Sequence, residues 1–99
     1  MRHFDLTQSA RADLLSIARY TQERWGATQR NAYLKEIDKR FRELAMNPLM
    51  GRTCDDIRDG YRKFPHGVHM IYYKLPGDEE LLIVRILHMT MDVESRIDT

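Results

Sequence analysis

The sequence has 99 residues, a length that suits one compact domain over residues 1–99, because a half-chain would bury too little core to fold by itself. Charged residues make up 31% and hydrophobic residues 42% of the chain, close to globular averages, so a disordered chain is excluded. No apolar run approaches the roughly 20 residues that span a bilayer, and we predict no membrane partner.

Charge and cysteine content indicate which partners and which cellular compartment to expect. The 16 basic and 15 acidic side chains give a net charge of +1, which does not favour direct nucleic-acid binding. Basic residues are in excess in residues 1–50 and acidic residues in 51–99, which is compatible with a basic helical face for an acidic partner. The first residues lack an apolar signal-peptide core, and Cys54 is the single cysteine, so we expect a cytoplasmic protein.

The first half predicts a short strand and two helices. Arg2 to Leu6 has the alternation of a strand, and Thr7 is a suitable N-cap for the helix that follows. Gly26 is expected to end this helix, and Asn47-Pro48 the second one. The two apolar stripes comprise Ala10, Leu14, Ile17, Ala18, Thr21 and Trp25 in the first helix, and Leu34, Ile37, Phe41 and Leu44 in the second.

Such a short turn between two helices predicts an antiparallel helical hairpin. The second half should cover it with strands at Tyr61–Phe64, Val68–Leu75 and Glu80–His88, after a loop over Leu49–Gly60. Pro76-Gly77-Asp78 is the expected turn between the last two strands. The predicted fold class is therefore α+β, with a short N-terminal strand and a two-helix hairpin packed on one face of a small, mainly antiparallel sheet in the order β-α-α-β-β-β.

The strand Glu80–His88 is apolar on both faces, which is typical of a central strand. Alternation groups Leu82, Val84 and Ile86 as an uninterrupted apolar set, so we expect that set to lie under the helices. Arg85 should then point to an open surface on the opposite face. An arginine within an apolar strand needs either a partner or such an opening.

Motif searches find no catalytic or metal-binding pattern, and we predict no cofactor, no metal site and no catalytic residue. Zincin, phosphate-loop and nucleophile-elbow spacings are absent. His66 and His69 are three residues apart on extended chain, which should point them to opposite faces. Cys54 is interpreted as a plain loop thiol. Trp25 is expected in the core, and Met89 and Met91 at the surface.

A basic group is the main candidate for ligand binding. Arg58, Arg62 and Lys63 lie near the start of one predicted strand, and they would converge with Arg85 on the open face of the sheet. Such a cluster suits a phosphate or a carboxylate. Charge alone leaves an RNA-cleaving site, a site for an acidic protein segment and a solvated surface open.

Several phrases in this order resemble the ParE toxins, a branch of the RelE/ParE superfamily of bacterial toxin–antitoxin systems, almost from end to end. The phrases are A-x-x-D-L-x-x-I-x-x-Y at Ala10–Tyr20, R-W-G at Arg24–Gly26, F-x-x-L-A-x-N-P at Phe41–Pro48, Met50-Gly51-Arg52, Asp56-Ile57-Arg58, Gly60-Tyr61-Arg62 with Phe64-Pro65, Gly67-x-His69-x-Ile71-x-Tyr73, and Val84-Arg85-Ile86-Leu87-His88-x-x-Met91-Asp92.

The resemblance implies a toxin that binds DNA gyrase and is neutralised by a ParD-like antitoxin. In the family, the antitoxin has a ribbon-helix-helix domain, so contact with operator DNA occurs only through the antitoxin in a hetero-oligomer. RelE relatives instead cleave messenger RNA on the ribosome. The strand end at His88 has one imidazole and no adjoining basic or tyrosine side chain, which favours the non-enzymatic gyrase branch. The alternatives are an endoribonuclease using His88 and Arg85, or a module that only pairs with its antitoxin.

The expected site residues fall into two sets. An acidic, apolar antitoxin segment is expected to bind across the helical hairpin and the open face of the sheet. The segment Met89–Ile97 is expected to bind the target, with packing of this tail on the sheet as the alternative. The residues assigned to antitoxin binding are Arg58, Arg62, Tyr73 and Arg85, and those assigned to target binding are His88, Met89, Met91 and Asp92.

Overall fold

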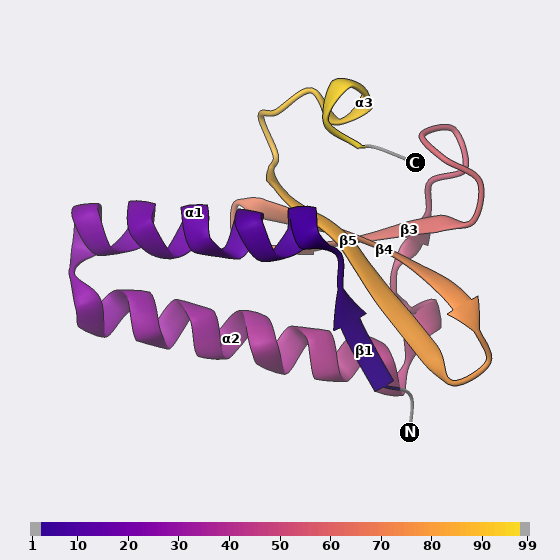
Figure 1. Ribbon diagram of the computed structural model, residues 1–99, viewed down its shortest axis with the longest axis horizontal. Coiled ribbons are helices and arrows are strands. Elements are labelled where there is room, and N and C mark those ends of the chain that lie inside the picture. Colours follow the sequence, from indigo (N-terminus) through magenta and orange to yellow (C-terminus); the bar gives the residue numbers. More distant parts are fainter. Residues whose placement is uncertain (1–2, 98–99) are drawn as a thin grey trace.

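The computed structural model describes residues 3–97 as a five-stranded sheet with a helical hairpin on one face (Figure 1). The elements in chain order are β1 (His3–Leu6), α1 (Gln8–Trp25), α2 (Ala27–Met46), a 3₁₀ turn (Pro48–Met50), β2 (Arg52–Thr53), β3 (Tyr61–His66), β4 (His69–Gly77), β5 (Glu80–His88) and α3 (Val93–Arg96). No helix within residues 3–97 has the length and apolar character to cross a membrane. The α+β prediction is confirmed.

The predicted helix ends are also confirmed. The Thr7 hydroxyl accepts a hydrogen bond from the Ala10 N–H at 3.0 Å, and it donates one to the Val84 carbonyl at 2.7 Å. The N-cap therefore fixes the start of α1 to β5 as well as satisfying a free helix N–H. Gly26, with φ of 92°, separates α1 from α2. That conformation strains any residue with a Cβ atom.

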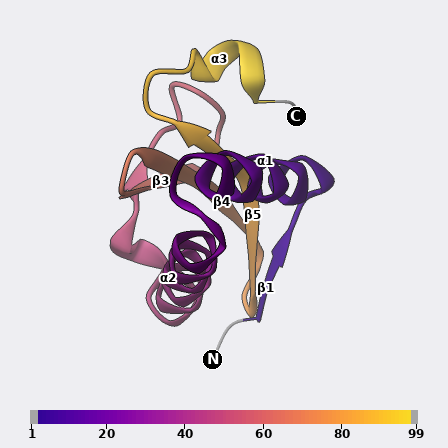
Figure 2. The same cartoon turned by 90° about the vertical axis from the view of Figure 1, so that its left-hand side faces the viewer.

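The sheet order is β1-β5-β4-β3-β2, with β1 parallel to β5 and the remaining pairs antiparallel. Figure 2 shows β1 next to β5. β5 is thus flanked by β1 and β4, as its apolar sequence predicted. Arg52–Thr53 forms β2 inside the segment that we expected to be only a loop. Two residues are too few to show a period in sequence, and this strand exists through its pairing with β3.

The face of β5 under the helices was predicted correctly for Ile86 and wrongly for Leu82 and Val84. Tyr72 pairs with Arg85 and Tyr73 pairs with Ile83, so Val84 is an extra residue in β5. Such a bulge interrupts the alternation of side chains. Leu81, Ile83 and Ile86 therefore pack under the helices, whereas Leu82, Val84 and Leu87 belong to the core on the other face.

Trp25 is another wrong prediction. Its side chain is 68% exposed, although the helical period placed it on the apolar stripe. Figure 1 shows the α1–α2 turn projecting beyond the sheet, so the last turn of α1 has no strand beneath it. Ala10, Ile17 and Thr21 on the same stripe are buried, since they lie where α1 covers the sheet. The helical spacing of apolar residues in α1 was identified correctly, but the sheet ends before the helix does.

Candidate functional site

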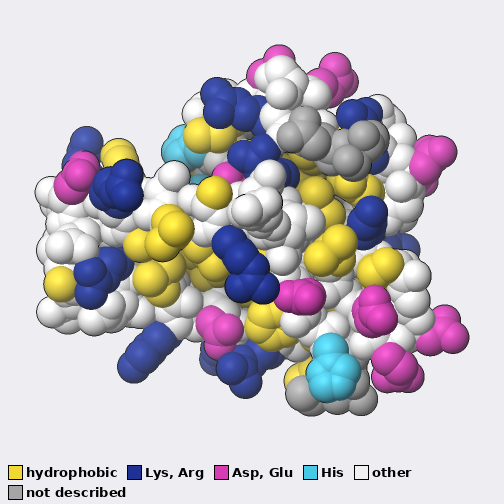
Figure 3. All heavy atoms as spheres, viewed as in Figure 1, with side chains coloured by type: hydrophobic (Ala, Val, Ile, Leu, Met, Phe, Trp, Pro, Cys, Tyr) yellow, Lys and Arg dark blue, Asp and Glu magenta, His cyan; other side chains and the backbone are white. Residues whose placement is uncertain are grey.

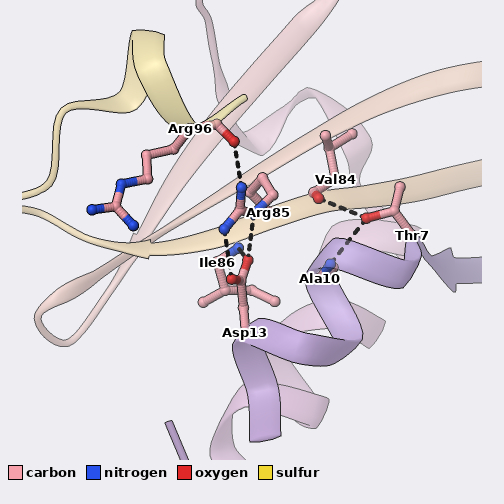
Figure 4. Close-up of polar contacts among 7 residues, drawn as sticks. All are labelled: Thr7, Ala10, Asp13, Val84, Arg85, Ile86 and Arg96. Carbon is pink, nitrogen blue, oxygen red and sulfur yellow. Dashed lines mark hydrogen bonds and ion pairs between the residues drawn. The ribbon is translucent and has the colours of Figure 1, made fainter. Parts of the chain in front are cut away.

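Arg85 lies between α1 and α3, and not on an open surface as predicted. Its Nε donates to Asp13 Oδ2 at 2.7 Å, and its Nη2 donates to Asp13 Oδ1 at 2.8 Å (Figure 4). The two side chains are 16% and 12% exposed, and Asp13 also accepts from the Ile86 N–H at 2.9 Å. A half-buried guanidinium is thereby held by a bidentate carboxylate, which is the geometry that arginine favours.

Two arginines hold the C-terminal segment through its backbone carbonyls. Arg85 Nη1 donates to the Arg96 carbonyl, and Arg58 Nη2 donates to the Ile97 carbonyl at 3.3 Å. Val93 and Ile97 pack on the second face of the sheet, where Ile97 is 3% exposed. These contacts match the alternative reading of this tail, in which it packs on the sheet and stabilises it.

Tyr73 and Arg62 are paired across β4 and β3, and both hold the segment before β2. The buried Tyr73 hydroxyl donates to the Pro48 carbonyl at 2.6 Å and accepts from the Gly51 N–H at 2.9 Å. Burial raises the pKa of Tyr73. A Cβ atom on Gly51 would lie 2.2 Å from that hydroxyl, so only glycine fits there. Arg62 donates to the Gly51 carbonyl at 2.6 Å.

The basic cluster predicted on one open face is therefore not formed. Arg58 and Arg85 bind backbone carbonyls of the tail, whereas Arg62 binds the backbone near β2. Tyr73 is wholly buried, and we withdraw it from the antitoxin-binding residues. Arg58 and Arg62 remain partly exposed.

The four residues assigned to the target lie where β5 leads into α3. Met89 and Met91 are 48% and 42% exposed, as expected for residues without a core position. Asp92 is the N-cap of α3, and its Oδ1 accepts from the Glu94 N–H at 3.2 Å. His88 Nδ1 lies 2.8 Å from Thr90 Oγ1.

His66, His69 and His88 occupy one row across three strands, which the sequence analysis missed. His66 pairs with His69 across the β3–β4 turn, and His69 pairs with His88 across β4 and β5. The two-residue turn at Gly67-Val68 returns the chain so that both ends face the same way, and the predicted opposite orientation of His66 and His69 is wrong. Their rings both contact Tyr33, at centroid distances of 5.5 and 5.8 Å.

The row also changes the chemistry expected at the end of β5. The Tyr33 hydroxyl lies 2.7 Å from His69 Nδ1, and the His69 and His88 rings are 5.7 Å apart. Burial, with smaller contributions from His88 and His66, lowers the pKa of His69. Burial and then Arg40 lower the pKa of His66. His88 therefore has a second imidazole beside it, and a tyrosine one step further, although neither is near it in sequence.

A separate apolar groove opens between α1 and α2 beside β1. It has a volume of about 470 Å³, and Leu15 on its wall is 69% exposed. Figure 3 shows a patch of hydrophobic side chains between the two helices on this side of the molecule. The groove is lined by Phe4, Leu6, Leu14, Leu15, Ala18, Leu34, Ile37 and Phe41, with Arg11 and Asp38 as its charged residues.

The sequence analysis did not predict the groove, although the apolar residues that line it give an indication of it. Leu15 adds an apolar residue beside the Ala10–Trp25 stripe and widens it toward β1. Phe4 and Leu6 sit on the short strand β1, and they are only partly buried. Apolar residues in excess of what the sheet can cover indicate a surface for a partner.

Comparison with known proteins gives a consistent family. Residues 4–93 match the family model described as "ParE toxin of type II toxin-antitoxin system, parDE". Toxin ParE1 of Mycobacterium tuberculosis is 40% identical over 92 residues, which cover 93% of this chain and 94% of that protein. Toxin ParE1 of Caulobacter vibrioides is 32% identical over 97 residues, covering 98% and 99% of the two chains.

A solved structure shares the fold. A chain of the "Chromosomal ParDE TA system from P. aeruginosa" superposes with a TM-score of 0.76, covering 89% of this chain and 96% of that one at 20% identity. The sequence matches extend over nearly the whole of each protein. The chain therefore belongs to the ParE toxins of type II toxin–antitoxin systems.

Proposed function

We propose that this toxin acts by binding DNA gyrase, without catalysis, and that a ParD-like ribbon-helix-helix antitoxin neutralises it through the groove between α1 and α2. The observation that carries the antitoxin part of the proposal is this open apolar groove between the two helices, with Leu15 69% exposed on its wall. A groove of this kind fits an amphipathic segment that places a few apolar anchors in it. It holds no constellation of acid, base and nucleophile.

The groove also changes where the antitoxin is expected to bind. The second face of the sheet is covered by Val93 and Ile97, so a segment there would first have to displace α3. The groove needs no such displacement. We therefore place the main antitoxin contact on the helical hairpin, and we keep Arg58 and Arg62 as contacts for acidic residues at the edge of the interface. Arg85 contributes by holding α1 and α3 together.

A charge introduced into the groove tests the antitoxin site. Leu15→Asp places a carboxylate on the apolar wall at an exposed position, so the fold should tolerate it. We expect its affinity for the cognate antitoxin to fall at least tenfold by titration calorimetry. Tyr20→Asp is the matched control, since Tyr20 is 58% exposed on the same helix and does not line the groove. Equal affinities of the two variants would contradict the groove as the antitoxin site.

Gyrase binding is assigned to the exposed end of β5. Met89 and Met91 offer adaptable apolar surface there, beside His88 and Asp92. The test is inhibition of gyrase-catalysed supercoiling by the purified toxin, compared between wild type and a Met89→Glu/Met91→Glu variant. The variant should lose inhibition and still bind antitoxin. Met46→Glu, at a 72% exposed methionine on α2, is the control that should remain inhibitory.

The ribonuclease alternative gains one observation from the histidine row. His69 supplies a second imidazole next to His88, which a general acid–base mechanism needs. Arg85, however, is held by Asp13 and has no geometry for an incoming phosphate. Messenger RNA cleavage on ribosomes that His88→Ala abolishes would replace the gyrase proposal. Inhibition of gyrase-catalysed supercoiling without cleavage of messenger RNA would support the gyrase proposal.

A further inference from the structure

We propose that His69 and His88 form a binding site for a single transition-metal ion of the Cu²⁺ class at the end of the β4–β5 pair. The two residues are directly paired across the strands, so their imidazoles leave the sheet at the same level. Both line one hollow of about 260 Å³ between β5, α1 and α3, and Met91 lines it too. The site shares His88 and Met91 with the proposed gyrase surface, but copper binding is measured on the toxin alone, so either proposal can fail without the other.

The ring geometry suits one shared ion. The centroids are 5.7 Å apart, and the ring planes make an angle of 81°. A metal about 2.0 Å from one nitrogen of each ring lies about 3.2 Å from each ring centre, so two ligands at angles of about 110 to 130° have centroids about 5 to 6 Å apart. The observed separation falls in that range before any side chain moves.

The hydrogen bonds of His69 and His88 use Nδ1 of each ring, so Nε2 of each ring is available to bind a metal ion. His69 Nδ1 lies 2.7 Å from the Tyr33 hydroxyl, and His88 Nδ1 lies 2.8 Å from Thr90 Oγ1. In metal sites the histidine nitrogen opposite the metal usually has such a partner, which fixes the tautomer and the ring orientation. In the metal-bound tautomer Nδ1 donates in both contacts, and His88 gives up the longer contact from the Thr90 N–H at 3.2 Å. Nε2 of each ring is then the ligand atom.

The charges around the hollow permit a cation. The Arg85 guanidinium lies in its wall, but the bidentate Asp13 carboxylate offsets that charge. Arg96 also lines the hollow, at its α3 side, but its side chain is exposed, so solvent screens its charge.

The donor set indicates the class of metal. Within residues 3–97, no three His, Cys, Asp or Glu side chains gather to hold an ion, so solvent or Met91 has to supply the remaining ligands. An incomplete site of this kind is exchangeable. Imidazole and thioether donors favour copper over magnesium, calcium or manganese, and Cu²⁺ has the highest affinity of the divalent first-row ions.

Copper titration of the untagged chain tests the site. Every protein in this titration carries His3→Ala as the background substitution, because His3 has an exposed imidazole outside the site. We expect one Cu²⁺ per chain by calorimetry, with nitrogen coupling from two imidazoles in the electron paramagnetic resonance spectrum. His88→Ala and His69→Gln should each lower the affinity at least tenfold. Tyr33→Phe, which removes only the hydroxyl that orients His69, should lower it a few-fold.

His66→Asn is the matched control, since His66 belongs to the same row but does not line the hollow. Its affinity should stay within about twofold of the background, and its melting temperature reports any damage to the fold. The proposal is overturned if no copper binds, if His88→Ala leaves the affinity unchanged, or if His66→Asn weakens binding as much as His88→Ala does. If a ligand variant unfolds, the spectrum of the His3→Ala protein still tests the site. Nitrogen coupling from fewer than two imidazoles in that spectrum contradicts the proposal.

Discussion

The two faces of the sheet are buried to a similar depth but by very different amounts of chain. On the first face, α1 and α2 with 18 and 20 residues cover a core that includes Phe41 and Ile37. On the second face, the four-residue α3 and the segment before β3 cover Tyr72 and Leu87. The first face is held by broad apolar contact, the second by a few side chains and two arginine contacts to backbone carbonyls. Stability should therefore reside mainly on the first face.

The largest expected effect is on the helix face. Phe41 is 2% exposed and contacts Phe4 with a ring separation of 5.6 Å, so Phe41→Ala leaves a cavity between α2 and β1. We expect the free energy of unfolding to fall by about 3 to 5 kcal/mol in urea titrations. Leu49→Ala, at a 67% exposed position, should change it by less than about 0.5 kcal/mol. A loss below about 1.5 kcal/mol for Phe41→Ala would contradict the dominance of this face.

The next effect concerns the ion pair that joins the two faces. Asp13→Ala leaves the Arg85 guanidinium 16% exposed and without its bidentate partner, so we expect a loss of about 2 to 4 kcal/mol. Asp5→Ala breaks an ion pair whose side chains are 63% and 78% exposed, and it should cost less than about 1 kcal/mol.

A double variant sharpens this comparison. Asp13→Ala with Arg85→Met removes both charges, and it should recover much of the stability lost in Asp13→Ala. If the double variant is no more stable than Asp13→Ala alone, the loss comes from packing and not from removal of the carboxylate charge beside Arg85.

The second face is tested at Ile97. This residue is 3% exposed and its N–H donates to the Val93 carbonyl at 3.1 Å, so Ile97→Ala removes the main apolar anchor of α3. We expect a loss of about 2 kcal/mol, at the low end for a buried isoleucine because few residues depend on it. Amide exchange of Ile97 should accelerate strongly, whereas exchange of Ile37 on α2 should follow only the global loss. Equal acceleration at both sites would mean that the two faces unfold as one unit.

The features that the sequence predicted are those set by neighbours along the chain. The Thr7 cap, the Gly26 turn and the bounds of β5 follow from local preferences for capping, left-handed φ and alternation. The bulge at Val84 and the two-residue β2 depend on the partner strand, and no period in their own segment reports them.

The same distinction applies to the candidate site. An arginine in an apolar strand indicated that Arg85 needed a partner, but Asp13 lies 72 residues away and is one of many acids that would serve. His88 was interpreted from its neighbours in sequence, whereas its neighbour across the strands is His69. Exposure of Trp25 depends on where the sheet ends, which the helix sequence does not report.

The smallest expected effect is on the pH dependence of stability, and it concerns the helix face again. Burial lowers the pKa of both His66 and His69 in the folded protein. The unfolded chain therefore binds more protons as the pH falls through the unfolded value of about 6.5, so this contribution to stability is present above that pH and is lost as the pH falls toward the folded values. Below the folded pKa values these groups cause no further loss of stability.

Because both rings are only partly buried, we expect the stability to change by less than about 1 kcal/mol between pH 7.5 and 5.5. Urea titrations of the His66→Asn/His69→Asn variant at both pH values should show a smaller difference than wild type. A double variant that keeps the full difference would assign the pH dependence to other groups.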